Sequence, residues 1–473
     1  MTAISGLPRT THSPSPRRVL RSVRDYVDAA ARQSPARLAV TVFAGVCAIF
    51  TLLLLAPWAT AAYAGASLVD ALFTAVSAVC VTGLTVVDTG LFWSTWGLVV
   101  ILLAIKVGGF GVMTLASILG LAVSRRIGLT QRMLTASEIK TDRLGEVGSL
   151  IKVVIVTATS LELIVAAMLL PRFLTLGHSL GQAAWRALFY GISAFNNAGF
   201  VPTPEGLVPY AGDWWLGLPL VLGVFVGALG FPVILNILVT RRKKQRTWTR
   251  WSLHAKLTIV TSAALVLVGW LAIMAMEWGN PATFGELAVG EKLMASLHSS
   301  VMPRSAGFAT VNVGAMNPSS RLATNALMFI GGGSASTAGG IKVTTLAVML
   351  LAIRAEARGN RDVEAFGRRV PKEALRVAIA VVFLAAMVVF TGTLVLLEIT
   401  GLSLDAVLVE VISAFATVGL STGITAGLPD AAKYVLCALM FIGRVGIMTF
   451  AAALALRQRQ RVIRFPAERP IIG

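Results

Sequence analysis

The chain has 473 residues, of which 56% are hydrophobic and 13% charged, and its mean hydropathy is +0.79. A soluble protein carries roughly 25% charged residues, so this composition excludes a water-soluble fold and indicates a polytopic membrane protein. The net charge of +19 does not indicate a nucleic-acid partner, because the Lys and Arg residues lie between apolar stretches, where they set membrane orientation.

Residues 1–37 are rich in Ser, Thr, Pro and Arg and precede the first apolar stretch. A signal peptide is not expected, because this stretch starts late and is long enough to cross the membrane. We therefore predict a cytoplasmic N-terminal arm. The three cysteines, Cys47, Cys80 and Cys437, have no paired spacing and are expected to be packed thiols, not a disulfide or a metal site.

A short glycine loop occurs four times, at intervals of about 110 residues, which indicates one structural unit used four times. Each loop follows an apolar segment that is too short to cross a membrane as a helix. The loop glycines are Gly83, Gly199, Gly307 and Gly419. The half-length segments before them are 67–79, 183–195, 290–301 and 404–416.

Long apolar segments flank each loop, so a unit is predicted to be a span, a half-helix with a returning loop, and a second span. The repeats are predicted at 38–123, 150–240, 257–353 and 374–456. The second spans are predicted as single segments at 96–123, 214–240, 322–353 and 433–456. The predicted fold class is an all-α polytopic membrane protein with four tandem helix–pore-loop–helix repeats around a pseudo-fourfold pore.

Basic residues lie between the repeats, in 124–149, 241–256 and 354–373, and in the tail 457–473. By the positive-inside rule, these segments and both termini are predicted to be cytoplasmic. The opposite loops carry acidic residues that would raise the cation concentration at an outer mouth, or that are simply solvated loop carboxylates. They are Asp88, Glu205, Asp213, Glu277, Glu286 and Asp430.

Backbone that leaves helical geometry inside a membrane must be buried or line a watery cavity, so four such breaks indicate a shared pore. Glycine tolerates positive φ at the turn, and carbonyl groups can then replace the hydration shell of a cation. One such glycine would be an ordinary helix cap, but four at matched positions favour a filter. The predicted ion-binding residues are Val81, Thr82, Gly83, Asn197, Ala198, Gly199, Ser305, Ala306, Gly307, Thr417, Val418 and Gly419.

The second span of the third repeat contains ten consecutive small residues, 331–340, which a stable mid-membrane helix would not contain. Small residues on one helix face would indicate tight helix packing, but an unbroken run favours a flexible segment beneath the filter that gates the pore. The predicted gate residues are Gly331, Gly332, Gly333, Ser334, Ser336, Thr337, Gly339, Gly340, Lys342 and Arg444.

Charges within the spans are costly and are therefore functional candidates. Arg444 lies in the middle of the last span. It is expected either to act as an electrostatic barrier below the filter or to form an ion pair with Glu162 or Glu410. The same two roles are open for Lys106 and Lys342.

Two arginines near the loop mouths, Arg186 and Arg304, are expected to satisfy carbonyl groups. Pro303 is expected to stiffen the start of the third loop.

Two other function classes, a carrier and an enzyme, fit the sequence pattern less well. A secondary carrier of another small solute, built on broken helices, would show inverted repeats, whereas these units begin and end on one side. A membrane-embedded enzyme is not supported, because the four histidines are scattered and no nucleophile is flanked by a base. No phosphate-binding glycine motif occurs, so nucleotide control would come from a partner.

The chain resembles the TrkH/Ktr/HKT superfamily of potassium transporters, and within it the KtrB type of ion-translocating subunit. The resemblance covers nearly the whole chain beyond the N-terminal arm. It rests on VTGLTVVDT at 81–89, NNAGF at 196–200, RSAGF at 304–308, the run 331–340, GRVG at 443–446 and RPIIG at 469–473.

The resemblance implies potassium uptake across a bacterial inner membrane, with the filter in the four loops, the gate at 331–340 and an axial positive charge at Arg444. It also implies a homodimer with one pore per protomer, a cytoplasmic RCK-type regulatory ring like KtrA, and Na⁺ as an activator, with no cofactor in this chain. Gly83 indicates potassium, since some plant relatives with serine there pass Na⁺. Lys106 departs from the family pattern, which has an uncharged polar residue there.

Overall fold

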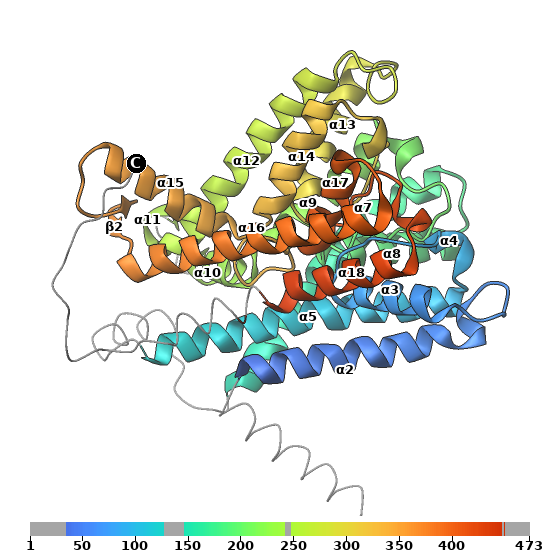
Figure 1. Cartoon of the computed structure of the whole chain (residues 1–473), viewed down its shortest axis with the longest axis horizontal. Coiled ribbons are helices and arrows are strands. Elements are labelled where there is room, and N and C mark those ends of the chain that lie inside the picture. The colour runs from blue at the N-terminus through green and yellow to red at the C-terminus, as the bar shows by residue number, and fades with distance from the viewer. Residues whose placement is uncertain (1–34, 127–145, 242–246, 447–448, 450–473) are drawn as a thin grey trace, which may run out of the picture.

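The computed structural model describes residues 35–126, 146–241, 247–446 and 449. The N-terminal arm, most of the loop 124–149 and the tail predicted from the sequence lie outside the described residues. The described chain is almost entirely helical (Figure 1). The α-helices are α2 (Pro35–Leu55), α3 (Leu68–Val79), α4 (Thr89–Phe92), α5 (Thr95–Arg126), α7 (Glu146–Thr175), α8 (Leu180–Phe195), α9 (Trp214–Leu229), α10 (Phe231–Arg241), α11 (Thr247–Arg250), α12 (Leu253–Glu277), α13 (Val289–Val301), α14 (Pro318–Ile330), α15 (Val343–Ala357), α16 (Lys372–Thr400), α17 (Leu404–Phe415) and α18 (Asp430–Phe441).

Short elements connect these helices. The 3-10 turns are η1 (Pro57–Ala59), η2 (Val208–Tyr210), η3 (Met302–Arg304), η4 (Val313–Ala315) and η5 (Thr425–Gly427), and η6 (Ile442–Gly446) is a π-helical turn. A two-stranded antiparallel hairpin, β1 (Glu364–Ala365) and β2 (Arg368–Arg369), joins α15 to α16, with Glu364 opposite Arg369. The sequence reasoning did not predict this hairpin.

Helices long and apolar enough to cross a membrane occur throughout the described part of the chain. Four such helices are described: 95–114 in α5, 152–175 in α7, all of α12 and all of α16. The bent pair α9–α10 would be a fifth span if its two helices are taken together. These helices confirm an all-α membrane protein. The four segments predicted as half-helices form α3, α8, α13 and α17.

The short helices start where the sequence provides capping groups. Ser67 accepts a hydrogen bond from the backbone N–H of Asp70 at the start of α3. Ser179 and Gln182 form a reciprocal capping box at the start of α8. These caps satisfy N–H groups that would otherwise be unpaired at a helix end in an apolar environment.

The packing of the helices closes a circle. The first long helix of each predicted unit packs on its own half-helix: α2 on α3, α7 on α8, α12 on α13 and α16 on α17. The helix that returns from each loop packs on the half-helix of the next unit: α5 on α8, α9 on α13, α14 on α17 and α18 on α3. The last unit therefore meets the first, and the four loops are brought around one axis.

Two of the four returning spans are not the continuous helices predicted from the sequence, and a third is interrupted where the sequence predicts a flexible segment. In 214–240, α9 ends at Leu229, Gly230 adopts φ of 92°, and α10 leaves at an angle of 93°. In 322–353, α14 and α15 are separated by the run 331–340 and the two residues after it. In 433–456, α18 passes into a π-helical turn at Ile442. A Cβ at Gly230 would meet the carbonyl of Ser334 in the third unit, and one at Gly333 would meet the carbonyl of Leu229 in the second. At the π-helical turn, a Cβ at Gly443 would meet the carbonyl of Phe415 in its own unit.

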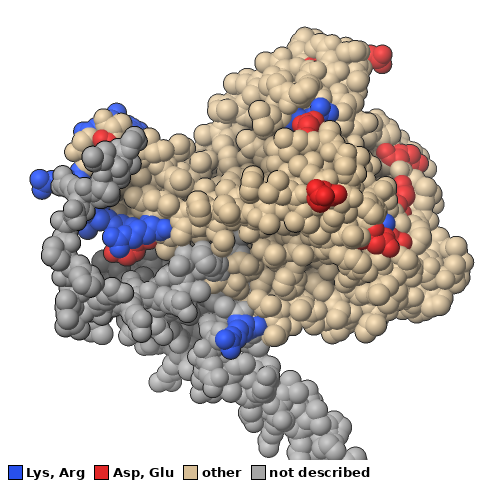
Figure 2. Space-filling model, in the orientation of Figure 1, with Lys and Arg blue, Asp and Glu red and all other residues tan. Residues whose placement is uncertain are grey.

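Charge is unevenly distributed on the face shown in Figure 2. Lys and Arg gather at the end that carries α15 and the hairpin, while Asp and Glu lie toward the opposite end, and most of the surface between them is uncharged. An uncharged band between two charged ends is the pattern expected of a chain that crosses a lipid bilayer.

Candidate ion-binding ring

The four glycine loops have closely related backbone geometry. Val81, Asn197 and Thr417, each two residues before a loop glycine, adopt φ of 57°, 61° and 48°. The loop glycines themselves have φ of 91° (Gly83), 70° (Gly199), 62° (Gly307) and 98° (Gly419). In the first, second and fourth loops, two left-handed residues so close together turn the chain sharply back after its half-helix.

The loop glycines meet in a closed ring. A Cβ atom added to Gly83 would lie 2.2 Å from the carbonyl oxygen of Ala198 in the second loop. The same relation links Gly199 to Ala306 at 2.3 Å, Gly307 to Val418 at 2.2 Å and Gly419 to Thr82 at 2.2 Å. Each glycine thus makes room for the carbonyl immediately before the glycine of the next loop. The sequence places all twelve predicted ion-binding residues in these four loops, and the structure brings the loops together.

A buried serine supports three of the loops from behind. It lies six residues before the glycine, as Ser77, Ser193 and Ser413. The N–H groups of Gly83 and Gly419 donate to the hydroxyl oxygens of Ser77 at 3.1 Å and Ser413 at 3.0 Å. Ser193 instead donates to the carbonyl of Phe200 at 2.9 Å. These serines were not predicted as site residues, although their repeated spacing before the loop glycines is visible in the sequence.

The third loop differs from the others. Val301 replaces the supporting serine, and Pro303 lies in the 3-10 turn η3 that continues from α13. Ser305 has φ of 156°, far from the left-handed values of Val81, Asn197 and Thr417. The backbone before Gly307 therefore differs from that of the other three loops. This difference is expected next to Pro303, because proline has a fixed φ and no N–H.

The run 331–340 is non-helical and lies directly against the loops. The N–H of Gly339 donates to the Ser305 hydroxyl at 3.3 Å, and a Cβ at Gly339 would lie 2.1 Å from the Thr417 hydroxyl. Thr337 donates to the carbonyls of Phe195 and Gly227 at 3.3 and 3.2 Å. The run therefore contacts the second, third and fourth units at the ends of their half-helices or in their loops.

The other end of the run rests on the broken span of the second unit. The N–H of Phe231 donates to the carbonyl of Ala335 at 3.2 Å, and that of Gly333 donates to the carbonyl of Ala228 at 2.7 Å. A Cβ at Gly230 would lie 2.6 Å from the carbonyl of Ser334. The bend at Gly230 and the run 331–340 thus fit each other.

Two cations hold the carbonyls of the run. Arg444 donates through Nη1 to the carbonyl of Thr337, and Lys342 donates to the carbonyls of Ala338 and Gly339. Arg444 is 2% exposed, and within the described part of the chain its Nε and Nη2 have no hydrogen-bond partner. A buried guanidinium held by a single neutral carbonyl keeps much of its charge uncompensated.

The predicted ion pairs of Arg444 with Glu162 or Glu410 are not present. Glu162 pairs with Lys106 at 2.9 Å. Glu410 accepts hydrogen bonds from the hydroxyls of Ser421 and Thr425 at 2.6 and 2.8 Å, and from the N–H of Thr422 at 3.0 Å. Both carboxylates are therefore bound to residues other than Arg444.

Of the two arginines near the loop mouths, Arg304 follows the prediction and Arg186 does not. Arg304 donates to the carbonyl and hydroxyl of Ser262 in α12, each at 3.0 Å. Arg186 instead lies 2.8 Å from the ring nitrogen Nε2 of His178.

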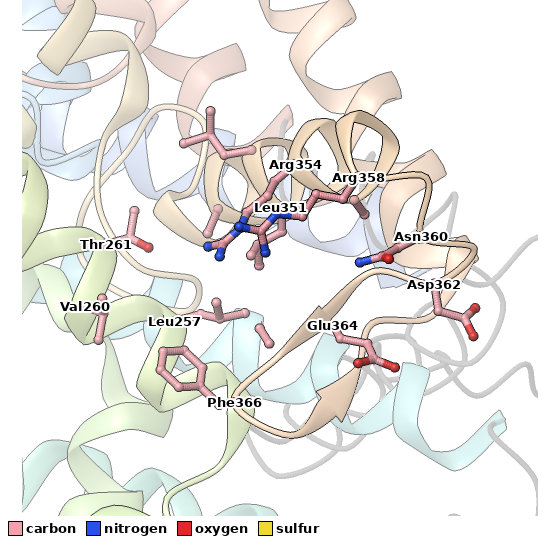
Figure 3. Close-up of a pocket in the computed structure, with 14 residues that line it drawn as sticks. Leu257, Val260, Thr261, Leu351, Arg354, Arg358, Asn360, Asp362, Glu364 and Phe366 are labelled. Atoms are coloured by element: carbon pink, nitrogen blue, oxygen red, sulfur yellow. The ribbon is translucent and has the colours of Figure 1, made fainter.

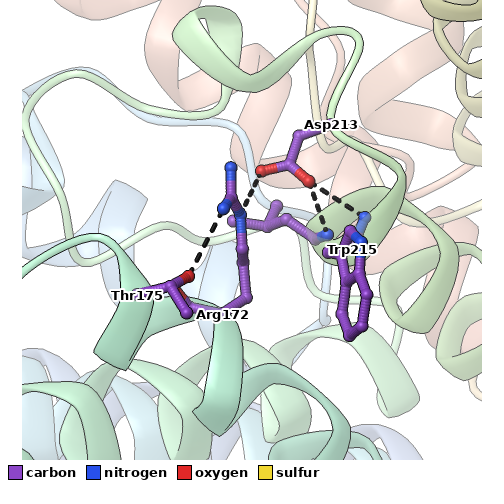
Figure 4. Close-up of polar contacts among 5 residues, drawn as sticks. Arg172, Thr175, Asp213 and Trp215 are labelled. Atoms are coloured by element: carbon purple, nitrogen blue, oxygen red, sulfur yellow. Dashed lines mark hydrogen bonds and ion pairs between the residues drawn. The ribbon is translucent and has the colours of Figure 1, made fainter.

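Several loop carboxylates have structural roles. Asp213 pairs with Arg172 at 2.7 Å and caps α9 by accepting the N–H groups of Trp215 and Leu216 (Figure 4). Asp88 caps α4 in the same way, Glu277 accepts from Asn280, Thr283 and Asn317, and Asp430 pairs with Lys433. The structure thus explains these four without a role in attracting ions.

A cavity of about 530 Å³ lies apart from the loops, between α12, α15 and the hairpin (Figure 3). Leu257, Val260 and Leu351 form its apolar part, while the side chain of Arg354 points into it. None of the predicted filter or gate residues lines it.

Comparison with known proteins identifies the family of this chain. A family model described as "TrkH: Cation transport protein" matches residues 44–462. The chain belongs to this family. The sequence-based resemblance is thereby confirmed, and this TrkH-family chain is a transport protein and not an enzyme.

Relatives of this TrkH-family chain include two proteins of Bacillus subtilis. The Ktr system potassium uptake protein B is 38% identical over 85% of this chain and 88% of the relative, and protein D is 37% identical over 93% and 97%. The potassium/sodium uptake protein NtpJ of Enterococcus hirae is 31% identical over 86% and 90%.

Among solved structures, the fold is similar to the potassium transporter TrkH from Vibrio parahaemolyticus. The TM-score is 0.70, with 88% of this chain and 83% of the other covered at 19% sequence identity. This likeness concerns the fold alone.

Proposed function

We propose that the chain takes up potassium ions across the cell membrane through a filter made of the four glycine loops. The ring of glycines and carbonyls carries the proposal: the carbonyls of Thr82, Ala198, Ala306 and Val418 each lie against the glycine of a neighbouring loop. Carbonyl oxygens can replace the hydration shell of an alkali cation. The half-helices end at these loops, and the negative ends of their dipoles, roughly half an elementary charge each, favour a cation there.

The run 331–340 is proposed as the gate, together with Lys342 and Arg444. Its contacts with Ser305 and Thr417 put it next to the third and fourth loops, where a shift of the segment would open or close the ion path. The charge of Arg444 supports a barrier role, since it has no acidic partner in the described part of the chain and would repel a cation below the ring.

Potassium as the substrate is supported by the names of the relatives, which are potassium or potassium/sodium uptake proteins. We further propose Na⁺ as an activator, a homodimer, and a cytoplasmic RCK-type regulatory ring, as the resemblance implies. The basic residues near α15 and the hairpin support a cytoplasmic position for that end of the molecule. A cytoplasmic position of both termini is proposed from the distribution of basic residues in the sequence.

A flux measurement in liposomes tests this function. The purified protein should pass K⁺ and Rb⁺ better than Na⁺. Gly83→Ser should lower this preference by about tenfold, because its Cβ would push on the Ala198 carbonyl and widen or distort the ring. Gly45→Ala, at a site where a Cβ meets nothing within 4 Å, is the control. Equal K⁺ and Na⁺ flux through the wild-type protein would contradict the proposal.

A further inference from the structure

The residue three positions before each loop glycine lies fully behind its loop and differs in chemistry from unit to unit. These residues are Cys80, Asn196, Arg304 and Ala416, each at most 2% exposed. Two of them form hydrogen bonds with the first long helix of their own unit. Asn196 donates to Glu162 of α7, and Arg304 donates to Ser262 of α12.

Of these two contacts, the one made by the second loop includes an acidic group. The side-chain N–H of Asn196 donates to Oε1 of Glu162 at 2.7 Å, and also to the carbonyl of Ile192 at 2.9 Å. Glu162 is 1% exposed. Its other oxygen, Oε2, lies 2.9 Å from Nζ of Lys106 in α5. The chain Lys106–Glu162–Asn196 therefore joins the returning helix of the first unit to the loop of the second.

Helix α5 meets this loop at a second point on the same face. A Cβ at Gly109, three residues after Lys106, would lie 2.2 Å from Oδ1 of Asn196. The Asn196 side chain is thereby held between a hydrogen bond to α7 and close packing on α5. Lys106 is further restrained by the Thr159 hydroxyl at 3.4 Å and by the ring of Phe110, whose centroid lies 5.5 Å away.

The Lys106 side chain is 25% exposed, whereas that of Glu162 is 1% exposed. Moving a carboxylate into an apolar medium is unfavourable unless a cation and hydrogen bonds compensate its charge. Nζ of Lys106 lies 2.9 Å from one oxygen of Glu162, and the Asn196 amide donates to the other. A carboxylate paired with a cation accepts a stronger, charge-assisted hydrogen bond than a neutral group does. Asn196 is followed directly by Asn197, with its left-handed φ, and by Ala198, whose carbonyl lies against Gly83. Because only Asn197 separates Asn196 from Ala198, a displacement of Asn196 would move the Ala198 carbonyl in the ring.

We propose that Lys106, Glu162 and Asn196 form a positioning set that fixes the second loop and so sets the ion selectivity of the ring. This inference rests on the proposed function of the loops as a filter. None of the three residues contacts the ion; the set acts by holding the carbonyl of Ala198 in place. It also gives Lys106, which departs from the family pattern, a defined role.

The test compares Rb⁺ and Na⁺ flux in liposomes with thermal stability in detergent. In the double variant Lys106→Gln/Glu162→Gln, both charges are removed together, so no unpaired charge remains buried. The Rb⁺/Na⁺ flux ratio should fall about fivefold, as expected when a charge-assisted hydrogen bond becomes a neutral one. Lys106→Arg should keep the wild-type ratio. Lys292→Gln, which removes a buried lysine that donates to the Trp278 carbonyl, is the control and should leave the ratio unchanged.

Asn196→Ala provides a second route that leaves the ion pair in place. It should lower the ratio by a similar factor, and adding it to the double variant should cause no further fall, because all three residues act through one contact chain. If the double variant does not fold, Asn196→Ala decides alone: a wild-type ratio in a folded Asn196→Ala protein overturns the inference.

A wild-type ratio in the folded double variant, or a further independent fall on adding Asn196→Ala, would also overturn it. These outcomes are distinct from failure of the proposed function, which would appear as an absence of K⁺ preference in the wild-type protein itself.

Discussion

At the residue scale, most of the candidate site is visible in the sequence as the repeated spacing of glycine and serine residues. The four glycines were predictable because the loops repeat along the chain, and each glycine accommodates a carbonyl that a Cβ would displace. The partners of the buried charges were not predictable. Glu162 lies near Lys106 only because α5 and α7 pack together, which no sequence spacing indicates.

Asp213 offers a prediction at this scale. Asp213→Asn removes the charge that pairs with Arg172 but keeps a side chain that caps helices equally well, so the free energy of unfolding should fall by about 1 kcal/mol. Thermal melting in detergent measures this loss. Glu205→Gln, at an exposed carboxylate of a loop, should not change the melting temperature. Unchanged melting of Asp213→Asn together with slower uptake at low K⁺ would instead show that Asp213 attracts ions.

At the element scale, the breaks in the returning helices decide how the space beneath the loops is filled. The composition of 331–340 predicts its non-helical backbone, because glycine-rich sequence is a poor helix former. The bend at Gly230 was missed. A lone glycine is common in membrane helices, and this one bends the chain because the carbonyl of Ser334, from another unit, occupies the position of its missing side chain.

The run 331–340 gives a prediction at this scale. In Gly339→Ala, the new methyl group would lie about 2 Å from the Thr417 hydroxyl and the Ala416 carbonyl, so the run must move away from the fourth loop. If the run is the gate, single-channel or liposome K⁺ flux should change by about fivefold or more while the protein still folds.

The control for that substitution is Gly427→Ala, at a site where a Cβ meets nothing within 4 Å. K⁺ flux that is the same in Gly339→Ala, Gly427→Ala and the wild-type protein would show that the run does not gate the pore.

At the scale of the whole molecule, the circle of packing contacts unites the observations. Each returning helix supports the half-helix of the next unit, and α18 supports α3 to close the circle. Composition and periodicity predicted the membrane class and the order of the helices. They did not predict the polar ties behind the loops, since these depend on side chains from separate units that meet only after folding.

The most direct measurement of the central claim is an anomalous diffraction map of crystals grown in Rb⁺ or Tl⁺, which stand in for K⁺. The account predicts an anomalous peak on the axis of the ring, within coordination distance of the carbonyls of Thr82, Ala198, Ala306 and Val418. The peak should weaken in Gly83→Ser. A strong peak elsewhere in the molecule, with none among these four carbonyls, would contradict the account.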